Sequence, residues 1–147
     1  MLRFAIILCA LAVAACASLE RGEVPITGYA WRVFWLKGWG VAEYSGLEGT
    51  EAAYFRLVDG RVEGSGGCNR IAGEYSQTGG QIEFMPMVST RRACIVGMER
   101  EDAFLQALEN VRLWQRRGDR LRLYDASGRM LMEMKAVLEK SAQPARN

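Results

Sequence analysis

The amino-acid sequence predicts an α+β domain that is mainly β: an antiparallel meander sheet or open barrel with one helix packed on it. Two observations carry this prediction. Short segments rich in aromatic and β-branched residues alternate with turn residues along most of the chain. One later segment instead has its apolar residues at helical spacing. The length of 147 residues and the 50% hydrophobic content fit one globular domain.

The expected strands are joined by short turns with glycine at the positions that favour a left-handed backbone. Asp59-Gly60 is a strong hairpin dipeptide, and Gly79-Gly80 and Gly118-Asp119 mark two further hairpins. The last two strands are separated by a longer turn over residues 125–128. In chain order the expected strands are 29–36, 53–58, 61–63, 71–76, 81–85, 113–115, 120–124 and 130–134.

The expected helix covers residues 98–111, where Phe104, Leu108 and Val111 recur at helical spacing. Three acids lie in its first turn, and we expect them to be solvated and favoured by the positive end of the helix dipole. Glu99 and Asp102, three residues apart, are also spaced to share a helix face, which would suit an acid–base pair if a cleft lay beside them. The three acids are Glu99, Glu101 and Asp102.

The tryptophans divide between core and surface. Trp31, Val33 and Trp35 alternate along the first expected strand, so we expect them to face inward as core residues. Trp39 lies in a Gly-flanked loop and is suited to a bilayer interface or a partner surface, the alternative being that it folds back onto the core.

We expect the N-terminal residues to be a targeting signal and not part of the folded domain. Arg3 precedes an apolar run over residues 4–17 that is too short to span a bilayer, as in a secretory signal. Residues 13–16, Val-Ala-Ala-Cys, resemble the lipobox of bacterial lipoproteins, which implies cleavage before Cys16 and a lipid on its sulfur. Ala17 is not the Asp that retains lipoproteins in the inner membrane of enteric bacteria, so the resemblance implies the outer membrane. The alternatives are ordinary signal cleavage near Ala15 or Ala17, or a retained anchor.

The expected targeting signal determines how we divide the chain into segments. We expect residues 1–15 to be a lipoprotein signal peptide and residues 16–27 a lipid-anchored tether. The folded domain would cover residues 28–138, followed by a flexible tail over residues 139–147. The membrane would then be one partner, held through the N-terminal lipid, at the periplasmic face of the envelope.

The four cysteines separate by their expected chemistry. Cys9 lies in the signal and Cys16 would carry lipid, which leaves Cys68 and Cys94 in the exported domain. An oxidising compartment favours a disulfide between them, worth about 3 to 4 kcal/mol in the chain-entropy model. Two buried free thiols or a metal pair are the alternatives, and two sulfurs without histidine make a poor metal site.

Composition narrows the possible chemistry. The chain has no histidine, which excludes Ser-His-Asp and Cys-His catalysis and any His-ligated zinc site. With 19 basic and 17 acidic residues and no dense basic block, it lacks the charge pattern of a nucleic-acid binder. We therefore expect no catalytic residues, no metal, no cofactor and no nucleic-acid partner.

Three smaller features have competing interpretations. The run Gly64-Ser65-Gly66-Gly67 is expected to make a tight strand connection, with an anion nest as the alternative, and Asn69 beyond it suits a left-handed or Asx turn. The pairs Arg91-Arg92 and Arg116-Arg117 offer small basic spots, with one charge on each face of a strand. A deep apolar pocket lined by Met85, Met87 and Met98 would indicate a small-ligand binder.

Several motifs together are similar to a known family. They are Gly67-Cys68-Asn69-Arg70 with Gly73 and Tyr75, Ser89-Thr90-Arg91 with Ala93-Cys94, and a helix ending in Phe104-Leu105. In this order and spacing, over about residues 31–134, they resemble the META domain of HslJ-type proteins. The resemblance implies a small, mainly β fold in secreted or lipid-anchored bacterial proteins, some of them heat-inducible, without established catalytic residues.

The leading functional hypothesis is a non-enzymatic, lipid-anchored periplasmic module that binds another envelope component during envelope maintenance or stress. One alternative is a small-ligand-binding envelope protein. A second is an enzyme that acts on envelope polymers through two carboxylates facing one cleft. An exposed binding surface, a closed cavity or a polar cleft would respectively favour the three hypotheses.

Overall fold

The computed structural model describes residues 24–41, 52–94 and 97–137. The expected signal peptide, most of the expected tether and the expected tail lie outside these residues. In the described part the elements are, in order, β1 (Ala30–Leu36), β2 (Gly40–Val41), β3 (Tyr54–Val58), β4 (Arg61–Ser65), β5 (Arg70–Thr78), β6 (Gln81–Phe84), β7 (Val88–Ser89), α1 (Met98–Asn110), β8 (Leu113–Arg117), β9 (Arg120–Tyr124) and β10 (Met130–Val137).

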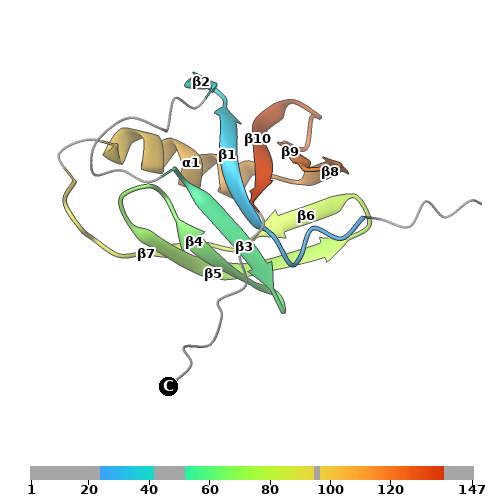
Figure 1. Ribbon diagram of the computed structural model, residues 1–147, viewed down its shortest axis with the longest axis horizontal. Helices are drawn as coiled ribbons and strands as arrows, with labels where there is room; N and C mark the ends of the chain where they lie inside the picture. The colour runs from blue at the N-terminus through green and yellow to red at the C-terminus, as the bar shows by residue number, and fades with distance from the viewer. Residues whose placement is uncertain (1–23, 42–51, 95–96, 138–147) are drawn as a thin grey trace, which may run out of the picture.

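Eight of these strands form a closed antiparallel barrel. Their order is β10-β9-β8-β6-β5-β4-β3-β1, and β1 also pairs with β10, which closes the ring. Figure 1 shows β1 and β10 side by side. The expected mainly β meander is confirmed, but the expected open barrel is wrong. Closure pairs the first and last strands of the meander, whose backbone groups would otherwise form two unpaired edges.

The short strands β2 and β7, which the sequence did not predict, lie outside this ring. Each is two residues long, and they pair with β1 and β5 respectively. The pairing between β6 and β8 is the shortest in the ring, because its register consists of the single pair Gln81 and Leu113. The helix lies between these two strands in sequence, so they do not share a hairpin. An open groove of about 370 Å³ lies beside this weak seam.

The barrel interior is filled by one cluster of apolar side chains. Alternate residues of each strand face inward, as on β3, where Phe55 is 0% and Leu57 is 1% exposed. The helix adds Phe104 and Leu108 to the same cluster. An eight-stranded barrel has an interior just wide enough for its own side chains. In the part of the chain that the structure describes, two grooves lie on the outer surface of this barrel.

The core begins before the first strand. Ile26, which the sequence assigns to the tether, is 1% exposed, and its carbonyl oxygen accepts a 2.7 Å hydrogen bond from Trp31 Nε1. Arg116 of β8 donates a hydrogen bond to the carbonyl oxygen of Pro25, and its guanidinium lies 4.1 Å from the ring centre of Tyr29. The chain thus enters the barrel along β8.

The alternation expected for β1 holds only for its first half. Trp31 and Val33 are buried as predicted, but Trp35 is half-buried and lies opposite Glu133. The reason is a register shift between Val33 and Trp35, because one extra residue reverses the faces of those that follow. Leu36 takes the inward position instead, at 1% exposure.

Turn chemistry agrees with the sequence. Asp59 and Gly60 both have positive φ, at 48° and 78°, as the tight hairpin between β3 and β4 requires. Between β9 and β10, the Asp125 carboxylate accepts hydrogen bonds from Ser127 and Arg129. These contacts, with the Ser127 hydroxyl first, lower the pKa of Asp125.

The helix runs behind β1 in the view of Figure 1. It starts after Gly97, whose φ of 95° suits glycine, and ends at Asn110, one residue before the predicted limit. Because Glu101, Phe104 and Leu108 are spaced three and four residues apart, all three lie on its buried face.

Candidate functional site

The connection between β4 and β5 is a tight turn that also binds an anion from within the chain. The Gly66 N–H donates to the carbonyl oxygen of Asn69 at 2.8 Å, and the Gly67 N–H donates to Ser65 Oγ at 3.1 Å. The next two backbone N–H groups, of Cys68 and Asn69, converge on the carboxylate of Glu101 at 3.0 and 2.6 Å. The expected tight connection is confirmed, and the anion it holds is a side chain of α1.

Glu101 is buried, which corrects the expectation that all three first-turn acids are solvated. It is 5% exposed, and it accepts a third hydrogen bond, from Asn69 Nδ2 at 2.7 Å. Glu99 and Asp102 are exposed as expected. The sequence pattern indicates why only Glu101 is buried, because it alone of the three acids has helical spacing to Phe104 and Leu108.

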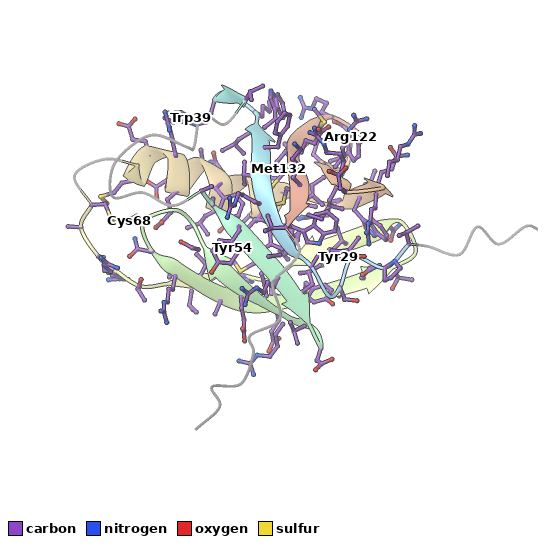
Figure 2. All side chains as sticks on the ribbon, viewed as in Figure 1. Tyr29, Trp39, Tyr54, Cys68, Arg122 and Met132 are labelled. Carbon is purple, nitrogen blue, oxygen red and sulfur yellow. A yellow bond between two sulfur atoms is a disulfide. The ribbon has the colours of Figure 1, made fainter. Side chains whose placement is uncertain are left out.

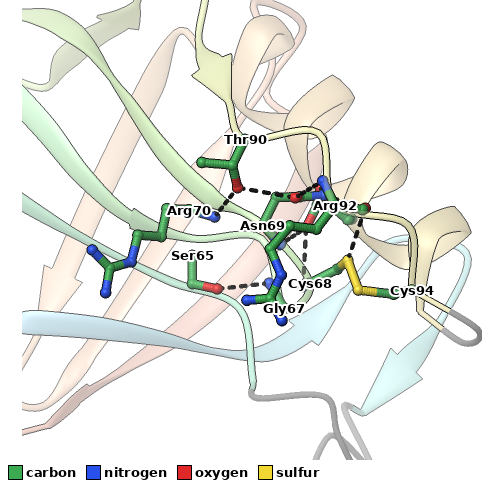
Figure 3. Close-up of a disulfide and its surroundings, with 9 residues drawn as sticks. Ser65, Gly67, Cys68, Asn69, Arg70, Thr90, Arg92 and Cys94 are labelled. Atoms are coloured by element: carbon green, nitrogen blue, oxygen red, sulfur yellow. Dashed lines mark hydrogen bonds between the residues drawn. A yellow bond between two sulfur atoms is a disulfide. The ribbon is translucent and has the colours of Figure 1, made fainter.

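Asn69 connects three segments of the chain. Its Oδ1 accepts hydrogen bonds from Thr90 Oγ1 at 3.0 Å and from the Arg92 backbone N–H at 2.8 Å, while its Nδ2 donates to Glu101. Figure 3 shows the contacts of Asn69 with Thr90 and Arg92. Among the described residues, Asp59 is the one non-glycine residue with positive φ, so the expected left-handed Asn69 is wrong. Its side chain is committed to partners about 20 to 30 residues away, and no local Asx turn forms.

The disulfide between Cys68 and Cys94 lies beside this cluster and is confirmed. Their Cα atoms are 6.1 Å apart, and the bond closes a loop with a sequence separation of 26 residues. The bond ties the β4–β5 turn to the segment that leads into α1 (Figure 3). The covalent link and the hydrogen bonds of Glu101 thus hold the same two segments together.

A groove on the outer surface begins where this polar cluster ends. Thr90 Oγ1 accepts a 3.1 Å hydrogen bond from the Arg70 backbone N–H, which fixes the edge of the groove. The groove has a volume of about 500 Å³ and crosses β3, β4, β5 and β7. Its lining residues are Tyr54, Arg56, Glu63, Gly64, Arg70, Ile71, Ala72, Val88, Ser89 and Thr90.

The groove combines aromatic, cationic and anionic groups. The Arg56 guanidinium lies 5.7 Å from the ring centre of Tyr54, and Glu63 and Arg70 also line the groove. Gly64 is required beside it, because a Cβ there would lie 2.1 Å from the Tyr54 carbonyl oxygen. Val88 is 69% exposed. A polar ligand with an apolar face fits this chemistry. No local signal in the sequence predicts the groove, because residues from four strands assemble it.

Trp39 lies in the turn between β1 and β2 and is 40% exposed. Its ring centre is 5.2 Å from the guanidinium of Arg100 on α1. Figure 2 shows it beside the helix, at the side of the molecule away from the groove residue Tyr54. Its role as a binding residue stays a prediction.

Two other sequence expectations are modified by the structure. Met98 is 47% exposed at the start of the helix, and Met87 packs over Gly73, so these methionines do not line one deep pocket. Arg116 and Arg117 face opposite sides of β8 as expected, whereas Arg91 and Arg92 are exposed in an irregular segment after β7.

An acidic side chain on the β10 surface organises two cations. Glu133 lies 2.6 Å from both Arg120 and Arg122, and its side chain is 11% exposed. Arg122, followed by Arg120, lowers the pKa of Glu133, and the carboxylate in turn raises the pKa of Arg122.

The described residues contain neither a membrane-spanning helix nor a cluster of metal-ligating side chains. No helix in that part of the chain is long and apolar enough to cross a membrane. No group of three or more His, Cys, Asp and Glu side chains there is placed to hold a metal ion.

The model of the META domain family matches residues 24–137. The chain belongs to the META domain family. Several solved structures share the fold of this chain. An NMR structure of a protein from Burkholderia xenovorans is 24% identical, has a TM-score of 0.60, and covers 76% of this chain and 83% of its own.

A crystal structure of a DUF4847 family protein from Bacteroides vulgatus is 16% identical, with a TM-score of 0.51 over 75% of this chain and 93% of its own. No curated protein matches the chain. These structural likenesses show a common fold alone, so the function must be argued from the surface of this molecule.

Proposed function

We propose that this META-domain protein is a lipid-anchored binding module at the periplasmic face of the cell envelope, without enzymatic activity. It would bind another envelope component during envelope maintenance or stress. The observation that carries the proposal is the contrast between a barrel interior filled by its own side chains and an outer groove of about 500 Å³. Binding at such a groove requires no change in the core.

The groove also has rigid support. Its edge at Thr90 is hydrogen-bonded to Asn69, which is held by the buried Glu101 carboxylate beside the disulfide. Binding sites on rigid elements lose less conformational entropy when a partner docks. The lipobox-like residues ending at Cys16 support the anchor, and Ala17 supports the outer membrane as its location.

A photo-crosslinking experiment tests the groove. A benzoylphenylalanine at Val88, which is 69% exposed and lines the groove, should capture a defined envelope component in living cells. The same probe at Val41, which is 58% exposed on β2, is the matched control. Capture should be lost when Arg70→Glu is added to the variant with the probe at Val88. The amount of captured component should differ between unstressed and heat-stressed cells. Equal capture at both positions, or none at Val88, would contradict the proposal.

The anchor is tested separately. Wild-type protein should incorporate a labelled fatty acid and fractionate with the outer membrane, whereas Cys16→Ala should lose both properties. Labelling that persists in Cys16→Ala would exclude the lipobox assignment.

A small-ligand binder is the second candidate, favoured by the groove volume, which falls within the range of small-molecule sites. The two candidates differ in what is captured at position 88. A protein adduct supports the interaction module, and an adduct of small mass supports the ligand binder.

A further inference from the structure

Basic side chains are concentrated on one half of the outer barrel surface. On β1, β8, β9 and β10 the residues that alternate with buried core positions point outward. Five of these outward residues are basic, and we call them the basic face: Arg32, Arg117, Arg120, Arg122 and Lys135. Glu133 is the acidic residue that these four strands place among them.

The other half of the barrel has a different balance. The outward positions of β3, β4, β5 and β6 carry equal numbers of basic and acidic residues: Arg56, Arg61 and Arg70 with Glu63, Glu74 and Glu83. The whole chain has a formal net charge of only +2. The nearly neutral composition therefore conceals an uneven distribution: the basic face has an excess of cations, whereas the outward strand positions of the other half are balanced.

The strand register aligns four cations in a row. Arg32 lies opposite Lys135, Lys135 lies opposite Arg120, and Arg120 lies opposite Arg117. Since neighbouring strands are about 4.8 Å apart, this row spans roughly 15 Å. Like charges directly opposite each other destabilise a sheet. Glu133 bridges Arg120 and Arg122 beside the row, so it offsets only part of this repulsion.

Aromatic surface lies within the same face. Phe34, at the register shift of β1, has the Arg120 guanidinium 4.1 Å and the Lys135 ammonium 5.3 Å from its ring centre. Trp35 next to it is half-buried opposite Glu133. Cations surrounding half-buried aromatic rings suit the boundary between lipid headgroups and acyl chains.

We propose that the basic face docks onto anionic phospholipid headgroups, which deepens the proposed function because it orients the anchored barrel on the membrane. The positive row and the phosphate-rich surface are complementary in charge, and a barrel wall with four aligned cations meets many headgroups at once. In Figure 2 the face lies around Arg122, on the opposite side of the molecule from Cys68. The groove edge at Thr90, which is hydrogen-bonded to Asn69 next to Cys68, would therefore stay accessible to a partner.

The start of the described chain favours a membrane over other polyanions. Pro25 is held by Arg116 of β8, so the tether leaves the barrel next to the basic face. Residues 16–23 separate a lipid at Cys16 from this point. At no more than about 3.6 Å per residue they reach roughly 30 Å. An acylated Cys16 would keep the basic face within that distance of the bilayer.

Vesicle binding of the unacylated protein tests the face independently of the lipid. The chain from residue 16 onward, carrying Cys16→Ser, keeps all described residues. We expect it to co-sediment with vesicles of phosphatidylcholine and phosphatidylglycerol, and to be released by salt. The variant R32Q/K135Q should bind roughly 30-fold more weakly, because each basic residue near an anionic bilayer contributes about five-fold. The matched control R61Q/R91Q removes the same charge from the other half and should bind like the parent chain.

Each outcome decides the proposal. Selective loss in R32Q/K135Q, with unchanged thermal unfolding, supports it. Equal weakening in both variants would reduce the effect to net charge and overturn it, as would absence of binding to anionic vesicles. Binding to an oligonucleotide at equal or higher affinity than to vesicles would assign the face to nucleic acid instead. None of these results depends on acylation, so a failure here is distinguishable from failure of fatty-acid labelling at Cys16.

Discussion

The buried carboxylate of Glu101 offers the sharpest test of how this fold is held together. It accepts hydrogen bonds from two backbone N–H groups and from the Asn69 amide, at 2.6 to 3.0 Å. Replacing Glu101 by alanine leaves these three donors without their acceptor. Each buried, unsatisfied donor costs about 1 to 3 kcal/mol of stability, and water that enters the space left by the side chain would reduce this cost. We therefore expect Glu101→Ala to lower the free energy of unfolding by about 4 kcal/mol.

The isosteric change separates charge from shape. In Glu101→Gln one oxygen still accepts from the two backbone N–H groups, but the new NH₂ faces the Asn69 amide. Asn69 cannot rotate to accept from it without losing its bonds with Thr90 and Arg92. Burying a neutral amide costs less than burying a carboxylate, which reduces the net loss. We expect a loss of about 2 kcal/mol, or roughly 8 °C in Tm for a domain of this size.

Urea unfolding of the oxidised protein, followed by tryptophan fluorescence, measures both values. Glu99→Gln is the matched control, because it removes the same charge from the same helical turn at an exposed position. It should change stability by less than about 0.5 kcal/mol. If Glu101→Gln were as stable as Glu99→Gln, the carboxylate would not organise the turn, and the account of this cluster would be refuted.

Three further results are expected. Gly66→Ala should destabilise the protein by about 1 to 3 kcal/mol, because the new Cβ would lie 2.5 Å from Glu101 Cγ. The same substitution should cost less stability when Glu101 is already alanine, and additive effects in this double-mutant cycle would contradict the prediction. Replacing Cys68 and Cys94 by serine should cost about 3 kcal/mol in urea unfolding, and an unchanged midpoint would contradict the role of the bond. The pKa of Glu133 is lowered in the folded state, so its contribution is present above its ordinary value of 4.5 and is lost as pH falls below it. Glu133→Gln should therefore show a smaller loss of stability as pH falls below 4.5, and an identical pH profile would refute the assignment.

The sequence predicted the elements of this fold because their signals are local. Asp59-Gly60 determines a hairpin through its own backbone preferences, and the spacing of Phe104 and Leu108 determines a helix with one buried face. The disulfide between Cys68 and Cys94 was also predictable, because one pairing was left after Cys9 and Cys16 were assigned to the leader and the anchor.

The errors came from relations between distant segments. Trp35 was expected in the core, and a single register shift in β1 turned it outward. Glu101 was expected in solvent, although its spacing to Phe104 indicated the buried face, because a buried acid requires donors that only the β4–β5 turn provides. Asn69 was expected to bond locally, but its side-chain partners are Thr90 and Arg92 in the segment after β7 and Glu101 on α1.

By itself, the sequence determined the family, most of the secondary structure and the disulfide, since each depends on residue type, spacing or motif order. The lipid attachment at Cys16 stays a prediction. The tertiary structure alone decided that β1 meets β10 to close the barrel and that four strands form the outer groove. It also decided that Arg32, Lys135, Arg120 and Arg117 form one row. Closure and strand register join residues that are up to about 100 positions apart, and the alignment of side chains across strands is fixed by that pairing rather than by any local pattern.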